Sequence, residues 1–304
     1  MKVYNSLEEY IPSKNGTSVA LGFFDGVHLG HREVIGSCVD EKGACRSAAL
    51  TFRESPAKAL KKPAPPLLTT NERKAELMAQ IGADDVIFAD FNDVKDLSPE
   101  AFVSEILRDR LNAKKVFCGF NYHFGRRGAG DTERLRRLCG EQGIEVIVKE
   151  PVTISGEQAS SSLIRDCISG GEIEKANRLL GYRYAIEGRI DSGNHIGTTM
   201  GFPTVNIPLG DGLTLPRFGV YASDLVIDGT RYMGATNIGV HPTVGAEEAP
   251  LCETFLLDFD GGDMYGKKAV CVLKSFVREE KRFRSTEELC EQIQKDCEFI
   301  RQSE

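Results

Sequence analysis

The residues with the clearest chemical potential lie in Leu21–His31, which reads LGFFDGVHLGH. His28 and His31 stand three positions apart after an apolar run, and three glycines are interleaved with them: Gly22, Gly26 and Gly30. A helix that begins near Leu29 would direct unpaired N–H groups and the positive end of its dipole at an anion. The glycines would let a phosphate approach the backbone, and both imidazoles could donate hydrogen bonds to phosphate oxygens. The alternative is a glycine-rich turn whose histidines bind local carbonyls.

A second polar group occurs in Ser160–Gly171, which reads SSSLIRDCISGG. Arg165 lies about one turn inside the helix that this segment predicts. Serine hydroxyls at a helix start and a first-turn arginine can bind a polyphosphate, because arginine makes fork-shaped contacts with phosphate oxygens. Alternatively, the serines only cap the helix and Arg165 is a solvated charge. Gly119–Asp131 is a third candidate, in which a strand end leads into a glycine-rich loop with two arginines. Its alternative is a flexible loop.

Further candidates lie in the second half of the chain. Thr204 and Asn206 alternate with Val205, so on a strand they would share one face, where two neutral oxygens could help to hold Mg²⁺. Otherwise they are polar residues on a solvated strand face. Glycines that could curl the backbone around phosphates precede them, at Gly193, Gly197 and Gly201. These glycines are not a P-loop, because no G-K-[ST] follows.

Glu253 is a carboxylate at the head of the apolar run ETFLLDF. A charged group at the start of an interior strand costs desolvation unless a metal, a hydroxyl or a cation meets it. The alternative is a surface glutamate in a salt bridge.

The first half of the chain alternates short apolar runs with amphipathic stretches, which predicts a parallel sheet flanked by helices. The predicted strands are Ser18–Phe23, Ser47–Phe52, Asp85–Asp90, Lys115–Phe120 and Glu145–Glu150. The predicted helices are Asn71–Gly82, Ser98–Leu111 and Asp131–Gly143, and Ser98 is expected to cap the second of these. The proline-rich segment Lys61–Thr70 is expected to be an extended surface loop.

After about Gly181 strand-like runs follow one another directly, which predicts an antiparallel barrel or sandwich. The last segment, Ser285–Gln302, has one apolar face and predicts a closing helix. We therefore expect two domains, 1–180 and 181–304.

Composition narrows the class of protein. The net charge of −7 argues against a general nucleic-acid or anionic-membrane binder. No apolar run approaches the ~20 residues that span a bilayer, and the N-terminal segment has no apolar signal-peptide core. The nine cysteines are scattered without a C-x-x-C pair, so we expect reduced thiols, no zinc site and a cytoplasmic protein.

H-x-G-H together with a late serine-rich helix start resembles the nucleotidylyltransferase superfamily. More narrowly, GFFDGVHLGH, GFNYHFG and SSSLIR resemble three motifs of the bacterial bifunctional riboflavin kinase/FMN adenylyltransferase (FAD synthetase) family. The likeness continues in order as GTTMGFPTVNI, LPRFGVYA, TNIGVHPTVG, ETFLLDF, MYGKK and EELCEQIQKD. It implies an α/β Rossmann-like adenylyltransferase domain followed by an antiparallel β-barrel riboflavin kinase domain with a C-terminal helix.

The resemblance also implies roles for individual residues. His28 and His31 would be catalytic in adenylyl transfer, and Glu253 would be the base that takes the proton of the ribityl 5′-hydroxyl. The adenylyltransferase half would bind ATP and phosphate through Gly22, Phe23, Asp25, Gly26, Gly30, Asn121, Ser160, Ser161, Ser162 and Arg165. The kinase half would bind ATP phosphates through Gly193, Gly197, Thr198 and Gly201, and flavin through Gly219, Val220, Tyr221 and Arg278. Thr204 and Asn206 would serve Mg²⁺ and ATP.

Three positions depart from the family's commonest pattern. Thr198 stands where a basic residue is usual, so a phosphate contact would have to come from elsewhere, such as Arg278 or Lys281. Thr51–Pro56 reads TFRESP in place of Thr-Phe-x-Pro-His-Pro, and Asn121 stands where many relatives carry Asp.

The expected reactions convert riboflavin and ATP to FMN and ADP, and then FMN and ATP to FAD and pyrophosphate. We expect no nucleic-acid or membrane partner, and a monomer or weak homo-oligomer. One rival is a nucleotidylyltransferase for a pantetheine or nicotinamide phosphate, which would need no such second half. The other is a flavin-binding or regulatory protein without catalysis.

Overall fold

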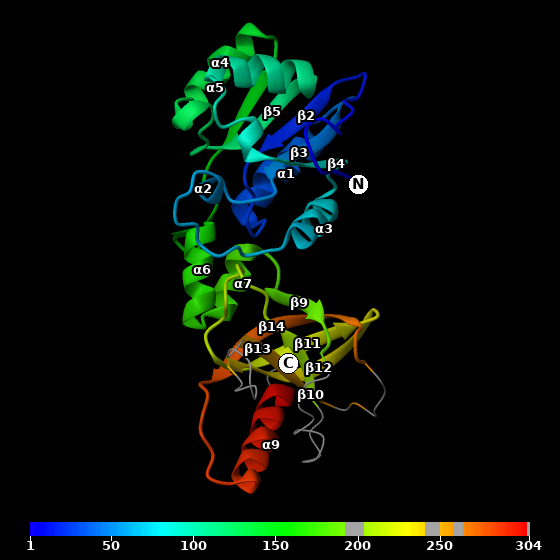
Figure 1. Cartoon of the computed structure of the whole chain (residues 1–304), viewed down its shortest axis with the longest axis vertical. Helices are drawn as coiled ribbons and strands as arrows, with labels where there is room; N and C mark the ends of the chain where they lie inside the picture. Colours follow the sequence, from blue (N-terminus) through cyan, green and yellow to red (C-terminus); the bar gives the residue numbers. More distant parts are fainter. Residues whose placement is uncertain (192–203, 241–249, 258, 260–263, 303–304) are drawn as a thin grey trace. The chain divides into compact units, whose positions relative to one another are not determined.

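The computed structural model describes residues 1–191, 204–240, 250–257, 259 and 264–302. The chain forms two compact units, Met1–Ser161 and Ser162–Glu304. The sequence predicts a boundary after residue 180. Because the second unit begins at Ser162, it contains almost all of helices α6 (Ser161–Gly170) and α7 (Ile173–Leu180). Figure 1 shows the helices and strands of both units.

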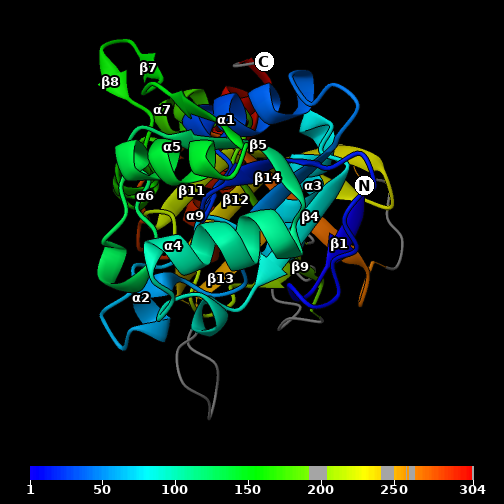
Figure 2. The same ribbon diagram turned by 90° about the horizontal axis from the view of Figure 1, so that it is seen from above.

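The first unit is built on a six-stranded parallel sheet with the strand order β1-β4-β3-β2-β5-β6. Its central strands are buried from end to end, as expected for a sheet that is covered on both faces. Figure 2 shows β1 beside β4, as the pairing requires. The strands are β1 (Lys2–Tyr4), β2 (Thr17–Leu21), β3 (Arg46–Phe52), β4 (Asp85–Ala89), β5 (Ala113–Gly119) and β6 (Glu145–Lys149). The first of these was not predicted from the sequence.

Helices cover both faces of this sheet. Helices α1 and α3 pack against each other, whereas η2 and α5 pack together over the side chains of Val19 and Leu21. A short hairpin of β7 (Thr153–Ile154) and β8 (Glu157–Gln158) follows β6 (Figure 2). The helices of the first unit are α1 (Leu29–Asp40), α2 (Pro56–Ala59), α3 (Asn71–Ile81), α4 (Pro99–Ala101), η2 (Phe102–Arg110) and α5 (Thr132–Glu141), with short 3-10 turns at Phe91–Asp93 and Arg126–Gly128.

The predicted helix Ser98–Leu111 differs from expectation in its winding. Ser98 caps it as expected, since its hydroxyl accepts a 3.1 Å hydrogen bond from the Ala101 amide. From Phe102 onward the helix is a π-helix with i→i+5 hydrogen bonds. Its buried residues are Phe102, Val103 and Leu107, and Leu111, which follows the helix, is buried as well.

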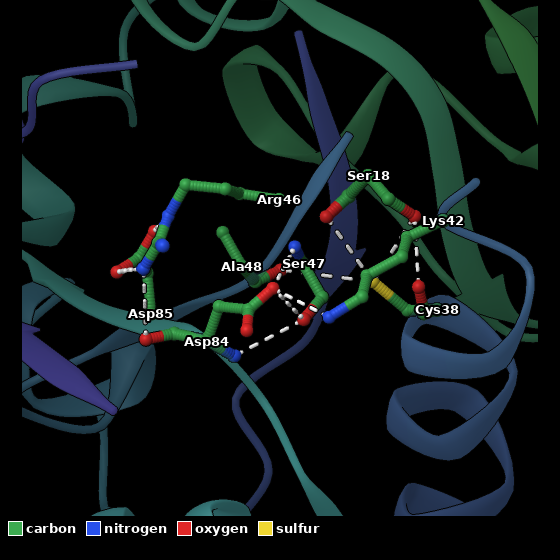
Figure 3. A network of polar contacts seen from close by, with 8 residues as sticks. All are labelled: Ser18, Cys38, Lys42, Arg46, Ser47, Ala48, Asp84 and Asp85. Carbon is green, nitrogen blue, oxygen red and sulfur yellow. Dashed lines mark hydrogen bonds and ion pairs between the residues drawn. The ribbon is translucent and has the colours of Figure 1, made fainter. Parts of the chain in front are cut away.

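The amino ends of β3 and β4 are joined by a polar network (Figure 3). Asp84 accepts hydrogen bonds from Lys42 Nζ at 2.6 Å and from the amide and hydroxyl of Ser47 at 2.9 and 3.0 Å. Arg46 binds Asp85 through two nitrogens. Burial alone would raise the pKa of Asp84, but the hydrogen bonds from Lys42 and Ser47 outweigh burial and hold this pKa below its usual value.

The second unit is a six-stranded antiparallel sheet with the order β10-β13-β12-β11-β14-β9. A bridge between Asp191, which follows β9, and Asn206 in β10 brings the two edges of the sheet together, so the sheet forms a nearly closed barrel, as predicted. The last helix, α9 (Thr286–Gln302, red in Figure 1), packs Cys297 and Ile300 against Ala222 and Ala235. The strands are β9 (Ala185–Arg189), β10 (Thr204–Pro208), β11 (Gly219–Ile227), β12 (Thr230–Val240), β13 (Pro250–Leu256) and β14 (Lys268–Arg278).

Candidate active sites

The first candidate site lies at the carboxyl ends of β2 and β5. The chain runs from β2 outward through β3 to β4 on one side and returns to β5 and β6 on the other, so the strand order reverses between β2 and β5. Ligands of open α/β sheets bind at such a switch point. The turn with the two histidines follows β2, and Asn121 follows β5 as an exposed residue.

The two histidine rings are stacked. Their centroids are 3.6 Å apart with planes inclined by 23°, and Phe24 meets the His31 ring edge-on. Burial, then the charges of His28 and Lys74, lower the pKa of His31 well below its usual value, so its imidazole is neutral at pH 7. The Nδ1 atom of His31 is buried and has no hydrogen-bond partner among the described residues. A buried polar atom of this kind is expected to bind a water molecule or a ligand.

The glycines of this turn make room for protein atoms. A Cβ at Gly30 would lie 3.2 Å from His28 Cε1, so the glycine lets the His28 ring fold back over the start of α1. Gly26 has a φ of +80°, and a Cβ there would lie 2.6 Å from Leu68 Cδ1. Helix α1 begins directly after His28, whose side chain makes no capping hydrogen bond to it.

The serine-rich start of α6 contacts the histidine turn through Ser161. Ser161, the first residue of α6, donates a 3.0 Å hydrogen bond to the carbonyl of Asp25. The Asp25 carboxylate in turn accepts the amide of Leu68 at 2.9 Å. Ser162 and Arg165 follow in α6 and belong to the second compact unit. Gly22, Phe23 and Ser160 are half-buried.

The second candidate site is a cross-strand row on the barrel. Neighbouring residues of this row pair in register across five adjacent strands, from β10 through β13, β12 and β11 to β14. The row brings four predicted site residues together and adds Asn237, which was not singled out from the sequence. Its members are Asn206, Glu253, Asn237, Val220 and Arg278.

Glu253 is half-buried and accepts a 2.6 Å hydrogen bond from the hydroxyl of Thr204. Asn206 is 8% exposed, and its Oδ1 atom has no hydrogen-bond partner among the described residues. A neutral, buried amide oxygen beside a carboxylate and a hydroxyl suits Mg²⁺, which prefers oxygen ligands. The described residues contain no group of three or more His, Cys, Asp and Glu side chains placed to hold a metal ion.

The residues predicted to bind flavin in the kinase half make different contacts within the protein. The Arg278 guanidinium is bound by Asp296 of α9, with Nη2 2.7 Å from Oδ2. Tyr221 is fully buried and donates its hydroxyl to the Arg217 carbonyl, so its side chain supports the core. At Gly219 a Cβ would lie 2.4 Å from the Arg278 carbonyl, so this glycine lets β11 and β14 approach. Gly193, Gly197, Thr198 and Gly201 lie outside the described residues.

Comparison with known proteins finds a matching family for each half of the chain. The family described as FAD synthetase matches residues 10–163, and the family described as riboflavin kinase matches residues 180–304. A bifunctional riboflavin kinase/FMN adenylyltransferase of Listeria monocytogenes is 36% identical, over 91% of this chain and 89% of its own length. The chain belongs to the bifunctional riboflavin kinase/FMN adenylyltransferase family. The resemblance seen in the sequence is thereby confirmed, and with it an enzyme of the kinase and nucleotidyltransferase classes.

Other members of this riboflavin kinase/FMN adenylyltransferase family are similar over comparable lengths. The relative from Escherichia coli strain K12 is 32% identical over 93% of this chain and 91% of its own. A solved structure from Streptococcus pneumoniae, described as a macrolide-efflux protein, covers 98% of both chains with a TM-score of 0.87 and 28% identity. Within the described ranges, no helix has the length and apolar character to cross a membrane.

Proposed function

We propose that this bifunctional enzyme of flavin cofactor synthesis divides its two reactions between its two halves. Residues 1–180 would adenylylate FMN at the turn after β2, and residues 181–304 would phosphorylate riboflavin at the cross-strand row. The family matches over residues 10–163 and 180–304 support this division. The observation that carries the first assignment is the stacked histidine pair at the switch point of the sheet, in which His31 Nδ1 has no hydrogen-bond partner among the described residues.

In the first half, a phosphate oxygen of FMN attacks the α-phosphorus of ATP, and the bond to the β-phosphate oxygen breaks. Negative charge grows on the oxygens of the α-phosphate and on the departing pyrophosphate. His28, His31 and the first N–H groups of α1 would donate hydrogen bonds to this charge. Donors to phosphate oxygens would also come from Ser160, Ser161, Ser162 and Arg165, and the remaining proposed contacts are Gly22, Phe23, Asp25, Gly26, Gly30 and Asn121.

In the second half, Glu253 takes the proton of the ribityl 5′-hydroxyl while that oxygen attacks the γ-phosphorus of ATP and ADP leaves. The hydrogen bond from Thr204 holds the carboxylate in one orientation for this transfer. Mg²⁺, when bound with ATP, would offset the charge of the phosphates. Thr204 and Asn206 would hold it, and this assignment is supported by Asn206 Oδ1, which has no hydrogen-bond partner within the described part of the chain. Flavin contacts are proposed for Gly219, Val220, Tyr221 and Arg278.

The proposed partners are the small molecules of these reactions: riboflavin, FMN, FAD, ATP, ADP and pyrophosphate. Cytoplasmic location is supported by the nine cysteines, which are scattered along the chain without a C-x-x-C pair, as suits a reducing compartment. A monomeric or weakly associating state remains a prediction.

The deciding experiment is to incubate the purified chain with riboflavin, ATP and Mg²⁺ and to separate the flavins by chromatography. We expect FMN to appear first and FAD to follow. FMN alone would leave only the kinase assignment standing, and unchanged riboflavin would contradict both. An incubation that starts from FMN tests the second step separately.

A further inference from the structure

A buried lysine with no role in the assignments above lies against the histidine turn. Lys74, in the first turn of α3, is 1% exposed. Its Nζ atom donates a 3.0 Å hydrogen bond to the carbonyl of Phe23 and lies 4.3 Å from the centre of the Phe23 ring. Lysine is almost never fully buried unless its charge is paired, because an ammonium loses its hydration there. Its burial at this position therefore needs an explanation.

The groups around Lys74 come from four elements. Asp25 in the turn attracts the ammonium, and His31 in α1 is titratable and feels the charge of Lys74. Thr51 from β3 donates its own 2.7 Å hydrogen bond to the Phe23 carbonyl, and Phe88 from β4 presents its ring 6.0 Å away. Only Asp25 is an anion in this set. Burial lowers the pKa of Lys74 to about 8, against the attraction of Asp25.

The residues that precede α3 are hydrogen-bonded to the histidine turn. The Leu68 amide donates to Asp25 at 2.9 Å, and the Gly26 amide donates to the Thr69 hydroxyl at 3.3 Å. Thr70 then caps α3 by accepting the Arg73 amide. The first turn of α3 is thereby held against the turn that carries the histidines.

We propose that Lys74 is a positioning residue for adenylyl transfer. Its ammonium fixes the Phe23 carbonyl and adds positive charge close to His31. This inference rests on the assignment of adenylyl transfer to the histidine turn. A fixed charge in a poorly hydrated interior attracts an anion strongly and does not have to reorganise during the reaction. The ammonium touches the backbone that carries the site and acts through it.

The protonated form of Lys74 is the active one, so the proposal predicts a pH effect in the unmodified chain. The kcat/KM of FMN adenylylation should fall as pH rises from 7 to 9.5, because the ammonium loses its proton near pH 8. The Lys74→Arg variant keeps a charge that does not titrate in this range, so its activity should stay within about tenfold and the fall should vanish.

Lys74→Met removes the charge and the hydrogen bond and keeps the length of the side chain. We expect kcat/KM for FMN adenylylation to fall about 10- to 100-fold at pH 7, with a flat profile up to pH 9.5. Lys42→Met is the matched control, because Lys42 pairs with Asp84 at the amino ends of the strands, whereas the histidine turn follows the carboxyl end of β2. It should change kcat/KM less than about twofold and keep the alkaline fall, since it leaves the site intact.

The outcomes separate this inference from the site assignment. If His31→Ala abolishes adenylylation while Lys74→Met leaves rate and profile unchanged, the inference is wrong and the site stands. If both variants are fully active, the assignment of the site fails as well. A flat profile in the unmodified chain also overturns the inference, and this measurement does not depend on the folding of any variant.

Discussion

The hydroxyl of Thr204 donates a 2.6 Å hydrogen bond to the carboxylate of Glu253, from one strand of the barrel to the next. On the same strand, Asn206 pairs in register with Glu253. A proposed base and two proposed metal ligands are therefore held together by rigid strands. Their different roles predict different responses to substitution.

Glu253→Gln keeps the size of the side chain and removes its ability to accept a proton. We expect the riboflavin kinase rate to fall about 10²-fold or more, because general-base catalysis typically contributes about 10²–10⁴-fold. ATP affinity and the conversion of FMN to FAD should be little changed. The measurement is the initial rate of FMN formation at saturating ATP, and an ordinary rate would reduce Glu253 to a structural carboxylate.

Asn206→Ala should respond to metal concentration, unlike Glu253→Gln. If Asn206 Oδ1 helps to hold Mg²⁺, its loss weakens metal binding, and excess Mg²⁺ should restore part of the kinase rate by mass action. Titrating Mg²⁺ over both variants in parallel tests this. Equal recovery in the two variants, or recovery in neither, would contradict the division of roles.

His31→Ala should impair the second reaction alone. A donor to developing charge is worth roughly 3–4 kcal/mol at comparable sites, so FAD formation from FMN should fall by about two orders of magnitude or more. FMN formation from riboflavin should stay near normal, and it serves as the internal control. Equal loss of both activities would point to a shared site.

The pKa of His31 also predicts a stability effect. In the unfolded chain the ring takes a proton near pH 6.5, whereas in the folded protein its lowered pKa keeps it neutral. The unfolded state then binds more protons, so stability falls as pH drops below about 6.5, by at most about 1.4 kcal/mol per pH unit. Denaturant unfolding at pH 7 and 5.5 should show a smaller loss for His31→Gln than for the unmodified chain.

Asp84→Asn should destabilise the first unit at the amino ends of β3 and β4, away from the histidines. It weakens the hydrogen bonds from Lys42 and Ser47 and removes the ion pair, at a cost of about 1–2 kcal/mol because the pair is partly exposed. The lowered pKa of Asp84 gives stability that is present above its unfolded pKa and lost as pH falls through its folded pKa. The difference from the unmodified chain should therefore shrink on acidification, which thermal unfolding at pH 7 and pH 3 would reveal.

The two activities should separate by truncation. Fragments 162–304 and 181–304 should both phosphorylate riboflavin and make no FAD. The longer one should be more stable by about 1–3 kcal/mol, because Asn177 donates to the Leu273 carbonyl and accepts the Tyr184 amide. A soluble, folded 162–304 fragment that binds neither riboflavin nor ATP would show that the barrel is not the kinase.

Much of the fold was predictable because its signals are local. The apolar runs at β2 and β4 and the capping of the helix after Ser98 depend on short stretches of sequence. The histidine turn was identifiable for the same reason. Its residue types and spacing suit an anion wherever the chain folds as strand, turn and helix.

Other features depend on contacts between distant segments. Lys74 reads as an ordinary charge on an amphipathic helix, and only its packing against Phe23 shows that it is buried. Asn237 joins the cross-strand row through the register of β12 with β13, which strand patterns do not fix. The π-helical winding after Phe102 was likewise not predicted from the sequence.

The bridge between Asp191 and Asn206 makes the barrel a cylinder with a fastened seam. The Asp191 amide donates a 2.9 Å hydrogen bond to the Asn206 carbonyl, and among the described residues this is the bridge that joins the two edges of the sheet. The residue whose side chain is proposed to hold Mg²⁺ thus closes the cylinder with its backbone. Occupancy of the kinase site should slow opening of the seam, and amide hydrogen exchange at Asp191 would then report ligand binding.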